Sequence, residues 1–201
     1  MNVIVPKSYL DSLEKSLEKA QEDLRRLLSV SKFIQQNQVM YLREEEIDIP
    51  AVESGFVINE SLVGVNGIAK FSKTFKTWFF RQTVKPRHEI HLSSYELLRT
   101  LKKGELFKQL AEYGKKEADF GAVLHILSFQ SEGRRSGYLH ADGHPNYVIM
   151  KSTKPQRQGD NRSKGDETRI VRLVHDTHGW NLHECSEHDL ILPEKSRIFC
   201  A

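Results

Sequence analysis

The sequence predicts an α+β fold: an antiparallel sheet, built as a meander of hairpins, with helices on one side and a long N-terminal helix ahead of it. Three apolar runs between residues 121 and 184 are separated by glycine-bearing turns and one long polar loop, which is typical of strands joined by hairpins. Leucines recur at helical spacing over residues 7–38. We therefore divide the chain into an N-terminal helical arm (residues 1–42) and a single α+β domain (residues 43–201) with a mobile loop at residues 152–168.

The composition is that of a soluble globular protein. The chain has 201 residues, of which 38% are hydrophobic and 28% charged, and its formal net charge is +3. No window approaches the run of about 18 apolar residues that spans a membrane, and the N-terminus has no basic region followed by an apolar one. We therefore expect a cytoplasmic protein without a membrane partner. Cys185 and Cys200 are too few for a disulfide framework, so both thiols are expected to stay reduced.

Several catalytic signatures are absent from the sequence. There is no phosphate-binding glycine loop of the Walker type, no G-x-G-x-x-G, no HExxH and no G-x-S-x-G. Each of these sequence patterns positions the catalytic or phosphate-binding groups of one reaction type. The absence of the patterns therefore argues against nucleotide hydrolysis and serine-hydrolase chemistry. Whether the protein is an enzyme stays open at this point.

The helical arm is predicted over residues 7–38. Ser8 and Asp11 match the capping-box pattern, in which a hydroxyl and a carboxylate accept hydrogen bonds from free amides of the first turn. Its hydrophobic seam consists of Leu10, Leu13, Leu17, Ala20, Leu24, Leu27 and Ile34. Such a seam suits two arrangements. In the first, the helix associates with a second copy of the chain or with a partner protein. In the second, the helix packs on the protein's own domain. The first arrangement would make the protein an assembly subunit.

The first half of the domain is expected to alternate between strands and helices. Residues 43–49 are an acidic link that ends at a proline, and residues 61–71 form a hairpin because Asn-Gly accepts a type I′ turn. A short strand over residues 89–92 is followed by a helix over residues 93–101, which Ser93 and Glu96 would cap. A second helix, beyond Gly104, covers residues 106–111.

The predicted sheet uses apolar segments of the second half of the domain. These segments are residues 121–129, 138–140, 146–150, 169–174 and 180–184. The last two flank Thr177–Gly179, which we expect to turn a hairpin.

One segment, residues 70–88, is the most basic and most aromatic of the chain and contains no acidic residue. It favours a non-enzymatic nucleic-acid-binding or accessory protein, with DNA and RNA both possible. As a helix, the segment would bury one aromatic face and expose its lysines, and as an extended chain its rings would stack on bases. The sequence does not choose between helix and strand for residues 73–83. The candidate nucleic-acid-binding residues are Lys70, Lys73, Lys76, Trp78, Arg81, Lys85, Arg87, Arg134 and Arg135.

A histidine-rich segment near the C-terminus favours a second function. If residues 171–184 form a hairpin, His175 and His183 could face each other across the strands, with Cys185 close enough to join them and His188 beyond. Imidazole and thiolate ligands suit zinc. The alternative function is therefore a metal-dependent hydrolase or nuclease of the zinc type. Otherwise no cofactor is expected.

A third group of residues surrounds His140. His140-x-Asp142, with a later histidine such as His188 and with Arg197, resembles in spacing the 2-His-1-carboxylate set of iron/2-oxoglutarate oxygenases. That resemblance implies a jelly roll, whose strand pattern is not evident in the sequence. Alternatively, His140, His144 and His175 could act as general bases or metal ligands of a hydrolytic or nuclease site.

Overall fold

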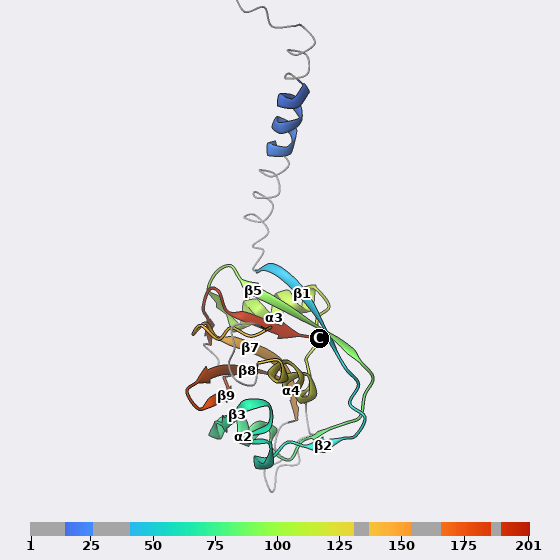
Figure 1. Ribbon diagram of the computed structural model, residues 1–201, viewed down its shortest axis with the longest axis vertical. Coiled ribbons are helices and arrows are strands. Elements are labelled where there is room, and N and C mark those ends of the chain that lie inside the picture. The colour runs from blue at the N-terminus through green and yellow to red at the C-terminus, as the bar shows by residue number, and fades with distance from the viewer. Residues whose placement is uncertain (1–14, 26–40, 131–136, 154–165, 186–189) are drawn as a thin grey trace, which may run out of the picture. The chain divides into compact units, whose positions relative to one another are not determined.

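The computed structural model of the protein describes residues 15–25, 41–130, 137–153, 166–185 and 190–201 (Figure 1). The chain divides into two compact units, residues 1–40 and residues 41–201. In the first unit, residues 15–25 are helical. The long helix predicted over residues 7–38 is thus corrected to this shorter helix, and the rest of that range lies outside the described residues.

The second unit is built on one seven-stranded mixed sheet (Figure 1). Its strands, in spatial order, are β1 (Tyr41–Ile49), β5 (Ile90–Leu97), β11 (Arg197–Cys200), β7 (Asn146–Thr153), β8 (Asp166–Asp176), β9 (Gly179–Glu184) and β3 (Ile68–Phe71). Four neighbouring pairs are antiparallel, whereas β11 with β7 and β3 with β9 are parallel. Two small two-stranded sheets join β2 (Phe56–Val57) to β4 (Thr83–Val84) and β6 (Leu101–Lys102) to β10 (Ile191–Leu192).

The predicted antiparallel meander is therefore wrong. Among the described strands of this sheet, only β7, β8 and β9 are neighbours both along the chain and in the sheet, while β11 and β3 enter it from distant parts of the chain. Parallel neighbours need long connections, and neither local alternation nor a turn motif identifies them. The ends of the predicted mobile loop, residues 152–153 and 166–168, belong to β7 and β8, and residues 154–165 lie outside the described residues.

Helical segments lie against both faces of the sheet, not one. On the first face, α2 (Lys73–Phe79) and α4 (Phe120–Ser128) share a hydrophobic core with Val148, Val171 and Leu173 of the central strands. The buried leucines of α3 (Lys103–Glu112) do not belong to that core cluster. Just after α3, Lys115 Nζ donates a hydrogen bond of 2.8 Å to Ser93 Oγ, on the second face of β5.

Two predicted elements have the wrong secondary structure, and a third, the strand predicted at residues 138–140, is an irregular segment. The apolar run at residues 121–129 is the helix α4 and not a strand, and Asp119 caps it by accepting a 2.8 Å hydrogen bond from Ala122 N. Residues 93–97, predicted to open a helix, belong to β5. Both segments are buried on more than one side, and such segments lack the polar positions that reveal a period.

Two further predictions near the start of the domain are corrected. The acidic link at residues 43–49 is part of β1, which pairs with β5. The hairpin at residues 61–71 is replaced by two 3₁₀ turns, η1 (Glu60–Leu62) and η2 (Val65–Gly67), which lead into β3. Asn66 does adopt the positive φ that its turn motif allows, 49°. However, the strand that follows pairs with β9 instead of folding back on its neighbour.

Candidate functional site

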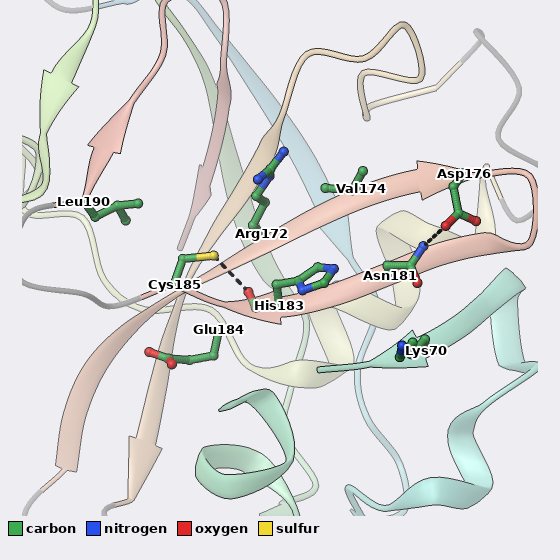
Figure 2. Close-up of a pocket in the computed structure, with 9 residues that line it drawn as sticks. All are labelled: Lys70, Arg172, Val174, Asp176, Asn181, His183, Glu184, Cys185 and Leu190. Carbon is green, nitrogen blue, oxygen red and sulfur yellow. Dashed lines mark hydrogen bonds between the residues drawn. The ribbon is translucent and has the colours of Figure 1, made fainter. Parts of the chain in front are cut away.

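An open depression of about 550 Å³ lies over β8 and β9 at the edge of the sheet (Figure 2). It is lined by Lys70, Arg172, Val174, Asp176, Asn181, His183, Glu184, Cys185 and Leu190. Strand pairing places its central side chains on one face, because Arg172 is opposite His183, Val174 is opposite Asn181, and Lys70 of β3 is opposite Asn181. The alternate residues of the same strands, including Val171, Leu173 and Leu182, are buried in the core behind this floor.

The centre of the depression is cationic. Lys70 and Arg172 are exposed, and neither forms an ion pair with any described residue. Partial burial lowers the pKa of His183 below its usual value of 6.5, and the positive charges of Arg172 and Lys70 lower this pKa further. The imidazole is therefore neutral at pH 7, with two permanent positive charges acting on it.

One acidic group stands at the end of the depression, beside the turn between β8 and β9. Asp176 Oδ1 accepts a 2.7 Å hydrogen bond from His178 N, and Asp176 Oδ2 accepts one of 2.8 Å from Asn181 Nδ2. These hydrogen bonds, above all the one from the His178 amide, lower the pKa of the exposed Asp176 carboxyl. Asp176 is thus a carboxylate at neutral pH, and it holds the Asn181 amide in a fixed orientation (Figure 2).

Glu184 does not neutralise these cations, because it has its own buried partner. Its carboxylate lies 3.3 Å from Arg169 Nη1, and the two side chains are only 6% and 10% exposed. The Arg169 guanidinium also stacks on Trp78, with 3.3 Å from its carbon to the ring centroid, and pairs with Glu167 at 2.6 Å. Trp78, one of the predicted nucleic-acid-binding residues, is therefore engaged inside the domain.

Of the residues predicted to bind metal, the structure brings His183 and Cys185 together but not His175. Adjacent residues of a strand point to opposite faces, so His175, opposite Trp180, faces away from His183, opposite Arg172. The His175 ring packs on Trp180 with centroids 4.9 Å apart. Cys185 lies in the depression with His183, and its thiol donates to the His183 carbonyl at 3.4 Å. His188 lies outside the described residues, among which no group of three or more His, Cys, Asp or Glu side chains could hold a metal ion.

The basic and aromatic segment is resolved into a helix, α2, and the short strand β4. As the helical alternative predicts, Phe75 and Phe79 are buried and Lys73 is exposed, so these two rings are not available to stack on bases. Hydrogen bonds from Ser72 N to Leu182 O (2.9 Å) and from Thr74 Oγ1 to Glu184 O (3.1 Å) place the start of α2 beside the end of β9.

The remaining predicted basic residues differ in their surroundings. Lys76 pairs with Glu60 at 2.9 Å. Arg81 and Lys85 are exposed, and Lys85 lines a different hollow of about 290 Å³. Arg134 and Arg135 lie outside the described residues.

The Arg87 side chain makes its contacts with other residues of the same domain. Its guanidinium contacts both carboxylate oxygens of Asp119, the residue that caps α4, and donates to Pro50 O at 3.0 Å and His88 O at 2.9 Å. A guanidinium with this many internal acceptors connects three segments of the chain and has few donors left for a ligand.

A second polar cluster surrounds His140, as the histidine alternative predicts. His140, His144 and His175 line a small cavity of about 20 Å³. His140 Nε2 is buried without a hydrogen-bond partner, 3.9 Å from Glu96 Oε2, and burial lowers the pKa of His140. Asp142 lies 3.8 Å from the other ring nitrogen. The described strands form one large mixed sheet and two small two-stranded sheets, and not the jelly roll that the oxygenase spacing implies.

Arg172 and Asn181 are residues of the depression that the sequence interpretation missed, as is Asp176 at its end. Both lie at polar positions between the apolar residues of β8 and β9, and that alternation was visible in the sequence. What the sequence could not show was that Lys70 of a distant strand lies beside them.

Comparison with protein-family models, with curated proteins and with solved structures finds no match to this chain. Among the residues that the structure describes, no helix is long and apolar enough to cross a membrane. Function must therefore be inferred from the depression itself.

Replacing Arg87 should destabilise the protein. In Arg87→Ala, Asp119 and two backbone carbonyls lose their shared donor, and we expect the free energy of unfolding to fall by about 2–3 kcal/mol. Lys85→Ala, two residues away and exposed, should change it by less than about 0.5 kcal/mol. Urea unfolding of both variants measures this difference. Equal stability of the two variants would show that Arg87 does not connect these segments.

Proposed function

We propose that the protein is a non-enzymatic nucleic-acid-binding protein and that the depression over β8 and β9 contacts the phosphates. The observation that supports this proposal most strongly is the pair of exposed cations, Lys70 and Arg172, which share one depression and have no ion-pair partner among the described residues. Unpaired cations in a concave surface attract anions, and phosphate contacts supply most of the affinity in non-specific nucleic-acid binding.

The surroundings of the depression suit this role. Among the described residues, no phenylalanine, tyrosine or tryptophan lines the depression. Binding there would therefore rely on charge and hydrogen bonds more than on base stacking, which predicts a strong dependence on salt and little dependence on base sequence.

Removal of the two cations tests the proposal. In the double variant Lys70→Ala and Arg172→Ala, affinity for a labelled single strand should fall about tenfold or more at low salt. The slope of log K against log salt should become shallower by about 1.4, since each phosphate contact on a single strand contributes about 0.7. Fluorescence anisotropy at several salt concentrations measures both quantities.

The matched control removes two exposed lysines elsewhere, Lys108→Ala with Lys116→Ala, so that both double variants carry the same net charge. If the control weakens binding as much as the test variant does, or if neither protein binds any nucleic acid at low salt, the depression is not a phosphate site.

His183 should make this binding dependent on pH. A phosphate beside the imidazole favours its protonated form, so the pKa of His183 is higher in the complex than in the free protein, where it is lowered. Affinity should therefore rise as pH falls from 7.5 to 5.5, by about threefold to fivefold for one added positive charge. Asp176, whose pKa is lowered, stays ionised over this range.

In His183→Ala the additional rise at low pH should disappear, while affinity at pH 7.5 should change little because the wild-type imidazole is neutral there. Binding measured at five pH values and constant ionic strength compares the two proteins. Identical pH profiles would exclude His183 from the phosphate site.

Self-association through the N-terminal helix is a second candidate function, and one observation favours it. Leu17 and Leu24, which are seven residues apart on the described helix, are 61% and 59% exposed. Two large apolar side chains at heptad spacing fit the seam of a coiled coil formed with a second copy of the chain.

The double variant Leu17→Glu and Leu24→Glu tests this association. We expect sedimentation equilibrium to show a dimer for the wild type and a monomer for the variant, since four buried leucines would be replaced by carboxylates. Lys19→Glu changes the net charge by the same amount on the opposite side of the helix and should leave the dimer intact. A monomeric wild-type protein would exclude this function.

A further inference from the structure

The charges in the depression match a ligand group with a single negative charge. Lys70 and Arg172 contribute two positive charges and Asp176 one negative charge, while Glu184 is paired with Arg169, so one positive charge remains. An internal phosphodiester carries one negative charge, whereas a terminal phosphate monoester carries about 1.5 to 2 at pH 7. A monoester would place its second charge near the Asp176 carboxylate. The charge balance therefore favours an internal phosphodiester over a terminal phosphate or a free nucleotide.

Hydrogen-bond acceptors lie next to these cations. Asn181 Nδ2 donates to Asp176 Oδ2 at 2.8 Å and to Gly179 O at 3.3 Å, so both amide protons are used inside the turn. Asn181 Oδ1 accepts no hydrogen bond from any described residue, and a ligand group at this position must therefore be a donor. Lys70 is opposite Asn181 on the neighbouring strand, about 4.8 Å away across the sheet.

A ribose 2′-hydroxyl satisfies this arrangement. It is a donor, and its carbon is bonded to the carbon that carries the 3′-phosphate, so a phosphate at Lys70 brings the hydroxyl toward Asn181 and Asp176. Deoxyribose has no such group, and this difference is how proteins distinguish RNA from DNA.

The position of the contact groups also favours a single strand. Arg172, Asn181 and His183 arise from the floor strands β8 and β9 (Figure 2). A single strand can bend one phosphate and its neighbouring sugar down to this floor. A duplex is a rigid cylinder whose 2′-hydroxyls lie in its own minor groove, and it cannot bend one phosphate and the neighbouring sugar down to this floor.

We propose that the depression binds one internal phosphodiester of single-stranded RNA, with Lys70 and Arg172 on the phosphate and the Asp176–Asn181 pair on the adjacent 2′-hydroxyl. This inference rests on the proposed nucleic-acid-binding function and specifies its ligand.

The test compares labelled strands of one sequence, about twelve nucleotides long: single-stranded RNA with a 5′-hydroxyl, the same RNA with a 5′-phosphate, single-stranded DNA and duplex RNA. We expect the single-stranded RNA to bind about tenfold more tightly than DNA, which corresponds to one hydrogen bond to a strong acceptor. The duplex should bind more weakly than the single strand, and the 5′-phosphate should add no affinity beyond its general charge.

Asn181→Ala should reduce the ratio of RNA to DNA affinity to about one while leaving DNA affinity nearly unchanged. Asp176→Asn should also reduce this ratio, although it should tighten DNA binding because a negative charge is removed. A control for charge alone is Asp48→Asn, an exposed carboxylate on β1 at the other edge of the sheet, which should keep the ratio unchanged.

The outcomes separate the two proposals. RNA and DNA of equal affinity, both weakened by removal of Lys70 and Arg172, would overturn the hydroxyl contact and leave the proposed function standing. Tighter binding of duplex RNA, or a large gain from the 5′-phosphate, would overturn the single-strand or phosphodiester assignment. Absence of binding to every strand would overturn the proposed function and this inference together.

Discussion

Alternation of side chains along β8 is the constraint on which both the core and the depression depend. Val171 and Leu173 are fully buried on one face, whereas Arg172 and Val174 line the depression on the other. Since the period of a strand is two, a slip of one residue would exchange these sets and bury a guanidinium. The pairing of β8 with β7 on one side and β9 on the other fixes this register. The stability of the sheet therefore also maintains the orientation of Arg172.

The sequence predicts the parts of the fold in which a local pattern is complete. The hairpin of β8 and β9 was predicted from alternation around Thr177–Gly179 and is confirmed. The helix α3 was predicted from its apolar spacing and is also confirmed. In contrast, α4 was mistaken for a strand because its apolar residues are buried almost all round. The two parallel pairings leave no local signal, so the meander was the wrong topology.

The candidate site was only partly predictable for the same reason. Lys70, His183 and Cys185 were each identified by residue type, but Lys70 was assigned to one hypothetical site and His183 and Cys185 to another. Because side chains alternate between the two faces of paired strands, β8 and β9 place His175 and His183 on opposite faces. The parallel pairing of β3 with β9 places Lys70 on the same face as His183. Residue types suggest chemistry, but the neighbours of a residue depend on register and on strand order. Neither of these follows from composition.

The parallel pairing of β3 with β9 also determines at which stage of synthesis and folding the depression can form. Lys70 precedes β9 by more than half of the domain, and contacts this distant in sequence form only after the entropy of closing the intervening chain has been overcome. During synthesis the basic segment leaves the ribosome long before its partners Arg172 and Asn181. A nascent chain therefore carries the charges of this segment without the depression, which is complete only in the folded protein.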